Sequence, residues 1–444
     1  MKKPGFTNLT ALTTLYVGCP MNHLRLSILL HLPRLAHLST SAPLQTDLLA
    51  DAASVTLRAC LKSFSFFNLC PVLDSIFSLT SPFTGLEELL ISFCNGPESL
   101  PHHIGDLPAG FCRLTALKAL SFSRLQHLVL PEDVGALGHL EALKLHDFQD
   151  LPLPASFTEL SSLTSLELNR CGGIHLPEAL GELSSLLELK FVDLSISTLP
   201  SSLTWLTRLE ALEVRGCSWL SEVPSRLDTL VKLKRLEMLA CPQLSEPCAG
   251  LPPSLESLSL GPFKEGSFHV VDISHLTQLR VLKLNRIGVQ CGPAVSSRVL
   301  CLQQLEQLEM HVESGNQQLP VPLTFLPRLR SLLIDAPGVC SLPENMGAAL
   351  SQLRQLQLLS WSQEELPGSI VGIRKLTSLK LRAPRLVALP QGMSCLARLR
   401  KLELVDCDTL QHLPECLTQL HHLILWHTPI RSLPANLVQL AEQP

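Results

Sequence analysis

Apolar positions recur along this chain in one frame that holds over most of its length. The clearest stretch runs from Leu160 to Leu183 and has the sequence LSSLTSLELNRCGGIHLPEALGEL. Stretches that begin at Leu206 and Leu396 align with it and share the pattern L-x-x-L-x-x-L-x-L-x-x-C-x-x-L-x-x-L-P-x-x-L. The third leucine of each unit recurs every 23 residues from Leu120 to Leu212, and then every 21 to 26 residues as far as Leu423. A frame of this length predicts a protein built from one repeated unit.

The two halves of the pattern predict different local structures. The L-x-L step places successive side chains on opposite sides, as a short β-strand does. In the L-P-x-x-L half, proline suits an extended position or the first turn of a helix. Neither half can bury its leucines alone, so neighbouring units must stack and share a core. Strands lie about 4.8 Å apart and the returning segments need more width. We therefore predict a curved α/β solenoid with a parallel β-sheet on the concave face and short helical or irregular segments on the convex face.

The repeat is less regular near the N-terminus. Residues 1–85 keep the frame only in pieces, such as the leucines at Leu32, Leu35 and Leu38. Residues 86–444 keep it throughout, with a period of about 23 residues. We interpret the first part as irregular repeats that continue directly into the regular solenoid.

Composition and charge limit the classes of partner and the cellular compartments that the sequence favours. The chain is 46% hydrophobic and 17% charged, with a net charge of -4 and no run of basic residues. These features argue against a nucleic-acid partner. The sequence contains no stretch of about 18 apolar residues, so it predicts no membrane span. The segment LTALTTLYVGC after Met-Lys-Lys-Pro has some features of a signal peptide but also fits the repeat frame. The odd count of 15 cysteines favours free thiols and a cytoplasmic or other intracellular setting.

Five cysteines share one place in the frame, five residues after the first leucine of the strand. This place points inward at the turn that leaves the strand, where a small thiol can meet unpaired backbone groups. We predict a structural role and weigh it against metal or redox chemistry, which would need histidine or carboxylate neighbours. These turn cysteines are Cys94, Cys171, Cys217, Cys241 and Cys407.

Catalytic and metal-binding motifs are weak in this sequence. Cys407, His412, Cys416 and His421 have a superficial metal-ligand spacing, but the frame turns Cys407 inward and puts both histidines on the returning segment. The sequence contains no Walker phosphate loop, no G-x-G-x-x-G and no nucleophile elbow. We therefore predict no metal, no cofactor and no enzymatic activity.

The solvent-facing positions of the predicted strands differ along the chain. The middle position of the L-x-L step often alternates in charge, which predicts a self-neutralising ladder or a mixed-charge recognition face. The ladder comprises Lys144, Glu167, Lys190, Glu213, Glu237, Ser259, Lys283 and Glu309.

Toward the C-terminus the outward positions become more apolar. An apolar cluster with a tryptophan and an arginine is typical of protein interfaces. We therefore predict a protein partner on the concave face that contacts Leu359, Arg382, Val405 and Trp426. The alternative is that Trp426 merely shields the edge of the sheet.

The pattern with cysteine at the turn and L-P-x-x-L on the return resembles the leucine-rich repeats of plant intracellular disease-resistance receptors. It is also similar to the 23-residue repeats of Ras-group proteins, which have asparagine where this chain has cysteine. The resemblance covers roughly residues 86–440 and implies a horseshoe-shaped, non-catalytic scaffold for protein recognition in intracellular defence or signalling. The nucleotide-binding switch that precedes those repeats is missing here. The alternative is a substrate-recruiting subunit of a ubiquitin ligase, whose repeats usually run nearer 26 residues and lack the recurrent L-P.

Overall fold

The computed structural model describes residues 11–17, 32–40, 60–67, 85–92, 107, 111–124, 129–244, 250–263, 273–287, 301–312, 319, 323–339 and 342–433. The chain divides into two compact units, Met1–Pro224 and Ser225–Pro444. Each unit is described by itself below. The predicted change in repeat regularity at residues 85–86 stays a prediction.

In the first unit, each strand pairs in parallel with the next strand along the chain. Its strands are β1 (Thr14–Val17), β2 (His37–Thr40), β3 (Ser63–Phe67), β4 (Glu88–Ser92), β5 (Ala119–Ser123), β6 (Ala142–Phe148), β7 (Ser165–Cys171), β8 (Glu188–Val192) and β9 (Ala211–Arg215).

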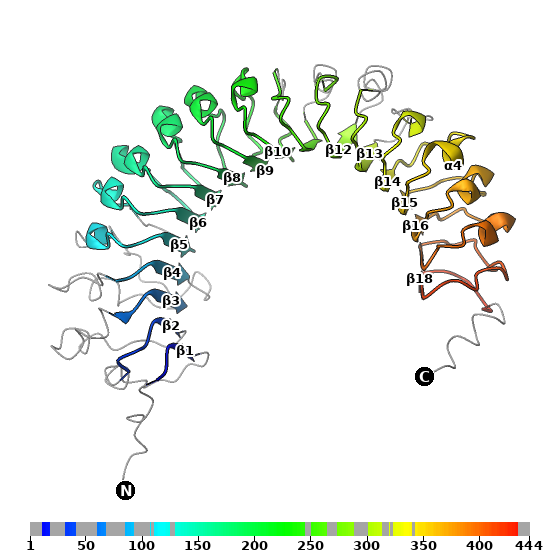
Figure 1. Ribbon diagram of the computed structural model, residues 1–444, viewed down its shortest axis with the longest axis horizontal. Coiled ribbons are helices and arrows are strands. Elements are labelled where there is room, and N and C mark those ends of the chain that lie inside the picture. Colours follow the sequence, from blue (N-terminus) through cyan, green and yellow to red (C-terminus); the bar gives the residue numbers. More distant parts are fainter. Residues whose placement is uncertain are drawn as a thin grey trace, which may run out of the picture. The chain divides into compact units, whose positions relative to one another are not determined.

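The second unit repeats the same parallel arrangement. Its strands are β10 (Arg235–Leu239), β11 (Ser257–Gly261), β12 (Val281–Ile287), β13 (Gln307–Val312), β14 (Ser331–Asp335), β15 (Gln355–Leu359), β16 (Ser378–Arg382), β17 (Lys401–Val405) and β18 (His422–Trp426). Within each unit the strands line one side, toward which the stack bends, and the returning segments line the other (Figure 1).

The returning segments are mostly short 3-10 helices. Several begin directly after the proline of the L-P step, which lies in an extended conformation before the first helical residue, as at Pro154, Pro177 and Pro200. The helices of the first unit are η5 (Phe111–Arg113), η6 (Val134–Ala136), η7 (Ala155–Glu159), η8 (Glu178–Glu182) and η9 (Ser201–Trp205). Those of the second are η10 (Leu227–Thr229), η13 (Leu323–Phe325), α4 (Met346–Ala349), η14 (Gly368–Gly372) and η15 (Gln391–Cys395).

The core is a column of leucines from both halves of the repeat. In β7 the side chains alternate between buried and partly exposed, and Leu166 and Leu168 are fully buried. Leu180 of η8 is fully buried as well. Both halves of a unit therefore contribute to one core, and the predicted solenoid of parallel strands and short helical segments is confirmed.

The residue directly after a strand often has a left-handed backbone. Asp193, Ser360, Asp406 and His427 have φ values of 51°, 58°, 47° and 48°. Residues with a Cβ rarely adopt this conformation, which costs roughly 1–2 kcal/mol. Because it recurs in both units, the turn belongs to the repeat itself and marks the carboxyl-terminal region of many strands.

None of the helices in the described part of the chain is long and apolar enough to cross a membrane.

Candidate functional site

The four predicted partner-binding residues lie at the ends of successive strands in the second unit. Leu359 and Arg382 end β15 and β16 and directly follow the paired residues Leu358 and Leu381. Arg382 pairs with Val405, and Val405 pairs with Trp426. We call this set, Leu359, Arg382, Val405 and Trp426, the strand-end row. At about 4.8 Å between strands, it extends roughly 15 Å along the stack.

Two members of the strand-end row are well exposed. Trp426 is 64% exposed, and the Arg382 side chain is 57% exposed. Leu359 and Val405 are partly exposed. The row therefore offers one large aromatic side chain and one guanidinium beside smaller apolar groups.

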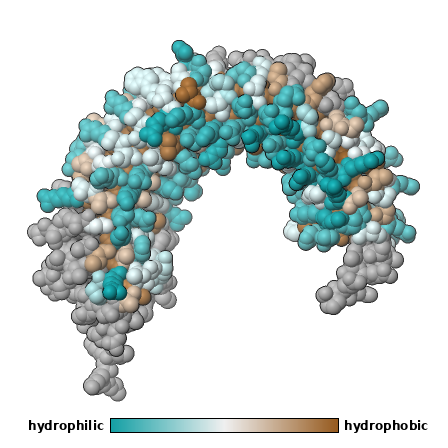
Figure 2. Space-filling model, viewed as in Figure 1, coloured by the Kyte–Doolittle hydropathy of each residue, from teal (hydrophilic) through white to brown (hydrophobic). Residues whose placement is uncertain are grey.

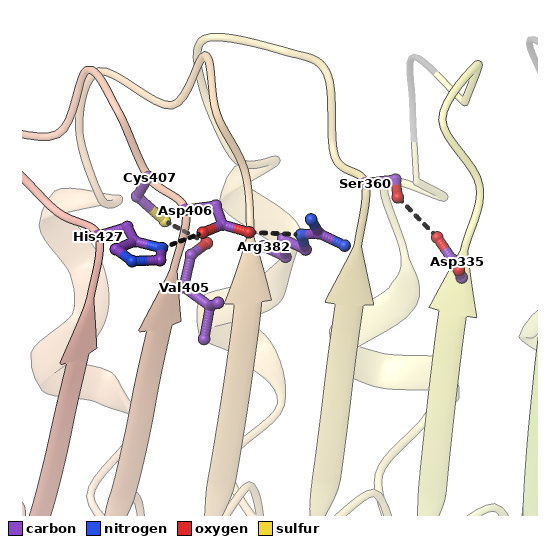
Figure 3. A network of polar contacts seen from close by, with 7 residues as sticks. All are labelled: Asp335, Ser360, Arg382, Val405, Asp406, Cys407 and His427. Atoms are coloured by element: carbon purple, nitrogen blue, oxygen red, sulfur yellow. Dashed lines mark hydrogen bonds and ion pairs between the residues drawn. The ribbon is translucent and has the colours of Figure 1, made fainter.

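Asp406 lies between two basic groups at the same edge of the sheet. The Nε of Arg382 donates a hydrogen bond to Oδ2 of Asp406 at 2.8 Å, and Nδ1 of His427 lies 2.9 Å from Oδ1 (Figure 3). The hydrogen bond of His427 is the largest cause that lowers the pKa of the Asp406 carboxyl; burial opposes it, and the hydrogen bond and charge of Arg382 lower the pKa further. The carboxylate thereby holds Arg382 in place beside Val405 and Trp426.

A second polar cluster surrounds Asp335 at the end of β14. Ser360 donates its hydroxyl to Oδ1 of Asp335 at 2.7 Å, as Figure 3 shows. His311 lies 3.1 Å from the other carboxylate oxygen and 3.2 Å from Oε1 of Glu309. This cluster continues the polar edge from β13 to β15.

The two clusters border open grooves at this edge of the second unit. The first, of about 620 Å³, is lined by Pro337, Ser360, Trp361, Ser362, Arg382, Pro384, Arg385, Asp406, Asp408 and His427. A neighbouring groove of about 950 Å³ shares Pro337 and Ser360 with it and continues to Arg286 and His311. Both grooves are open, and their linings combine apolar and polar groups that could contact side chains of another protein.

Sequence reasoning named Arg382 but missed the floor of the first groove. Trp361 stands five residues after Leu356, the place that cysteine occupies in other units. Its ring is buried and its Nε1 donates to the carbonyl of Glu365 at 3.1 Å. The tryptophan that replaces the turn cysteine at this position is the sequence feature that could have indicated the groove.

The turn cysteines of the described repeats are fully buried. Cys171 donates its thiol to the carbonyls of Leu145 and Asn169, at 3.3 and 3.5 Å. Cys407 contacts the carbonyl of Val405 at 3.5 Å (Figure 3). Burial raises the thiol pKa of Cys407, and that of Cys171 to about 11.

The remaining turn cysteines follow the same arrangement as far as they are described. Cys217 and Cys241 are buried beside the carbonyls of Arg215 and Leu239, and Cys94 lies outside the described residues. A buried thiol of this kind is a poor nucleophile and redox group.

The residues with metal-ligand spacing point to different environments. Cys407 is fully buried, whereas His412 and His421 are exposed and Cys416 is partly exposed. Among the residues with described positions, no three His, Cys, Asp or Glu side chains gather closely enough to hold a metal ion.

The charged ladder follows the strands as the sequence frame predicts. Lys144 pairs with Glu167 across β6 and β7, with 3.8 Å between Nζ and Oε2. Lys283 and Glu309 do the same across β12 and β13 at 3.3 Å. Figure 2 shows mainly hydrophilic residues along the strand side. Exposed pairs of this kind contribute little each, at most about 1 kcal/mol.

Comparison with known proteins agrees with this architecture. A family model described as a leucine-rich repeat region matches residues 179–322. A leucine-rich-repeat protein of Leptospira interrogans has a similar solved structure, with 22% identity and a TM-score of 0.63, covering 96% of this chain and 98% of that one. The chain thus has the leucine-rich-repeat fold, which generally serves as a non-catalytic scaffold for protein binding.

Two further solved structures are more distant. An internalin of Listeria monocytogenes is 19% identical, with a TM-score of 0.46, and the match covers 70% of this chain and 81% of that one. The leucine-rich-repeat ectodomain of the Arabidopsis thaliana receptor kinase GASSHO1/SCHENGEN3 is 19% identical, with a TM-score of 0.48, covering 98% of this chain and 57% of that one. No curated protein sequence matches this chain significantly.

Proposed function

We propose that this protein is a non-catalytic scaffold that binds a protein partner through the strand-end row of its second unit. The observation that carries the proposal is an exposed tryptophan and an exposed arginine in one row of the sheet, on strands that are separated by a single strand. Trp426 and Arg382 flank Val405 in one row of the sheet. Tryptophan and arginine commonly dominate protein interfaces, because each combines a large contact area with directional polar groups.

The fixed position of Arg382 supports this role. Its guanidinium already hydrogen-bonds Asp406 through Nε, so less side-chain freedom is lost when a partner binds. Its Nη1 and Nη2 groups donate no side-chain hydrogen bond to a described residue, and Arg382 lines the first groove. A carboxylate or carbonyl oxygen of a partner would accept hydrogen bonds from these two groups.

The proposed setting is intracellular, in defence or signalling. The resemblance of the repeat pattern to plant intracellular resistance receptors supports the role, and the cysteines support the compartment. All nine cysteines that the described part of the chain includes are free thiols, several of them buried singly. Reduced, unpaired cysteines are typical of cytosolic proteins.

The test begins with a partner captured by pull-down from the source organism. Trp426→Ala and Arg382→Ala should each weaken its binding at least about tenfold, as expected for central interface residues. Circular dichroism should stay unchanged, because both side chains are exposed.

Two matched controls are available in the first unit. Trp205 is 62% exposed at the end of η9. The Nε of Arg170 lies 2.8 Å from Oδ1 of Asp147, so Arg170 is another exposed arginine paired with an aspartate at the strand ends. Trp205→Ala and Arg170→Ala should bind normally. The proposal is wrong if these controls lose binding while the Trp426 and Arg382 variants retain it.

A further inference from the structure

A column of residues marks the start of each strand in the second unit. Backbone hydrogen bonds define it, because the N–H of each member donates to the carbonyl of the member one unit earlier, for example Arg354 to Arg330 at 2.8 Å. We call this set the start column. In order it comprises Lys234, Glu256, Arg280, Glu306, Arg330, Arg354, Thr377, Arg400 and His421.

The charge of the start column changes halfway along. From Lys234 to Arg330 basic and acidic residues alternate, so each charge has an opposite neighbour about 4.8 Å away. From Arg330 to His421 the column contains no acidic residue. The alternation therefore ends at β14.

Neighbouring positions add to this positive charge. The turns just before β14 to β17 also carry Arg328, Arg374, Lys375 and Arg398, and Lys401 begins β17. We call the whole group the basic edge. It comprises Arg328, Arg330, Arg354, Arg374, Lys375, Arg398, Arg400 and Lys401.

Most cations of the basic edge have neutral partners or none. Arg328 donates to the side chain of Gln304, and Lys375 donates to Oε1 of Gln352 at 2.7 Å. Arg400 donates to backbone carbonyls, that of Gln419 at 3.0 Å. These bonds hold the side chains in place but leave their charge uncompensated.

Acidic partners reach only the two flanks of the basic edge. Arg330 pairs with Glu306 at 3.0 Å, and Lys401 pairs with Glu403. The other six cations have no ion pair with any described residue, and five of them are exposed. Repulsion among them acts over a Debye length of about 8–10 Å, so the group forms one continuous positive surface.

We propose that the basic edge binds an acidic segment of the protein partner, rich in aspartate and glutamate. The surface spans four strand starts, about 15 Å. An extended peptide rises about 3.3 Å per residue, so roughly five residues cover it. Arginine forks suit carboxylates, because two N–H groups can donate to both oxygens.

A nucleic acid fits the basic edge less well. Binding to single strands usually combines a basic track with aromatic side chains that stack on the bases. The four turns and strand starts, residues 326–331, 350–355, 373–378 and 396–401, contain no aromatic residue. Carboxylates need only the cations, so the acidic peptide is the better match.

This inference rests on the proposed protein-recognition role but uses the other end of the same strands. The strand-end row lies at the carboxyl ends of β15 to β18, and the basic edge lies at the amino ends of β14 to β17. A partner that spans the strands could reach both surfaces. The two can nevertheless be tested separately.

The experiment measures binding of a labelled decaglutamate peptide by fluorescence anisotropy at low salt. The double variant Arg354→Gln/Arg400→Gln should weaken binding at least about fivefold, and binding should fall steeply with added salt. Arg280→Gln is the matched control. It changes the same residue type in the same column, but Arg280 lies between Glu256 and Glu306. This control should change the affinity less than about twofold, because the two acidic residues that flank Arg280 in the column repel an acidic peptide there.

Three results would overturn the inference. The peptide could fail to bind at low salt, or Arg280→Gln could weaken binding as much as the double variant. A labelled single-stranded oligonucleotide with ten phosphates could also bind the basic edge more tightly than the peptide does. Trp426→Ala should leave peptide binding unchanged, so failure here is distinguishable from failure of the strand-end row.

Discussion

Both units place an aspartate between two basic groups at the end of a strand, yet the surroundings differ. In the first unit Asp147 lies between Arg170, at 2.8 Å, and Arg124, at 3.7 Å. In the second unit Asp406 lies between Arg382 and His427, at 2.8 and 2.9 Å. The backbone frame is the same, with a left-handed residue at each aspartate.

The difference lies in what stands next to these carboxylates. Beside Asp147 the outward residues are polar, with His146 pairing with Asn169 across β6 and β7. Beside Asp406 they are Val405 and the exposed Trp426. One frame thus produces a polar surface in one unit and an amphipathic one in the other. Local substitution, and not a change of fold, creates the proposed recognition surface.

The shared frame predicts equal core energetics in both units, and this is the largest effect expected. Leu168 and Leu404 are fully buried at equivalent strand positions. Leu168→Ala and Leu404→Ala should each reduce the free energy of unfolding by about 3 kcal/mol, through lost burial and a cavity. Urea unfolding measures both. A loss below about 1 kcal/mol at either site would mean that the two units do not share one packing scheme.

Thiol reactivity sharpens the comparison between buried and exposed cysteines. Cys171 and Cys407 are fully buried, whereas Cys301 and Cys395 are exposed. With a pKa of about 11, Cys171 is roughly 0.1% thiolate at pH 8. Iodoacetamide at pH 8 should modify the exposed pair at least about 100-fold faster, as peptide mass spectrometry can follow. Equal rates would contradict the structural role of the turn cysteines.

The same comparison shows what the sequence could and could not predict. The frame of leucines placed the strands and the turn cysteines, because burial must follow the repeat. It also placed Leu359, Arg382, Val405 and Trp426 on neighbouring strands. The contacts of Asp406 with Arg382 and His427 could not be predicted, since Asp406 and His427 both lie in the left-handed turns that follow the strands.

The basic edge was missed for a related reason. The sequence shows no basic run, and we took this as evidence against a nucleic-acid partner. Arg330, Arg354 and Arg400 lie far apart in the chain, and only stacking brings them into one column. In a repeat protein, a charged surface is therefore found by comparing the residues at the same position of successive repeats, because stacking brings those residues together.

The smallest effect concerns pH. The pKa of the Asp406 carboxyl is lowered in the folded protein, so its contribution to stability is complete above the unfolded pKa, about 3.9. That contribution is lost as pH falls through the folded value. Asp406→Asn should therefore be slightly less stable than the wild type at pH 7, and this difference should shrink as the pH falls toward 2. Thermal unfolding at both pH values checks this. A stability difference between the wild type and the variant that grows at low pH would contradict this pH dependence.

The most direct test of the central claim is photo-crosslinking to the bound partner. Benzoylphenylalanine would replace Trp426 in one protein and Trp205, which is similarly exposed on η9, in another. Contact at the strand-end row predicts a crosslinked complex from position 426 and none from position 205. A crosslink from position 205 with none from position 426 would contradict recognition at the strand-end row.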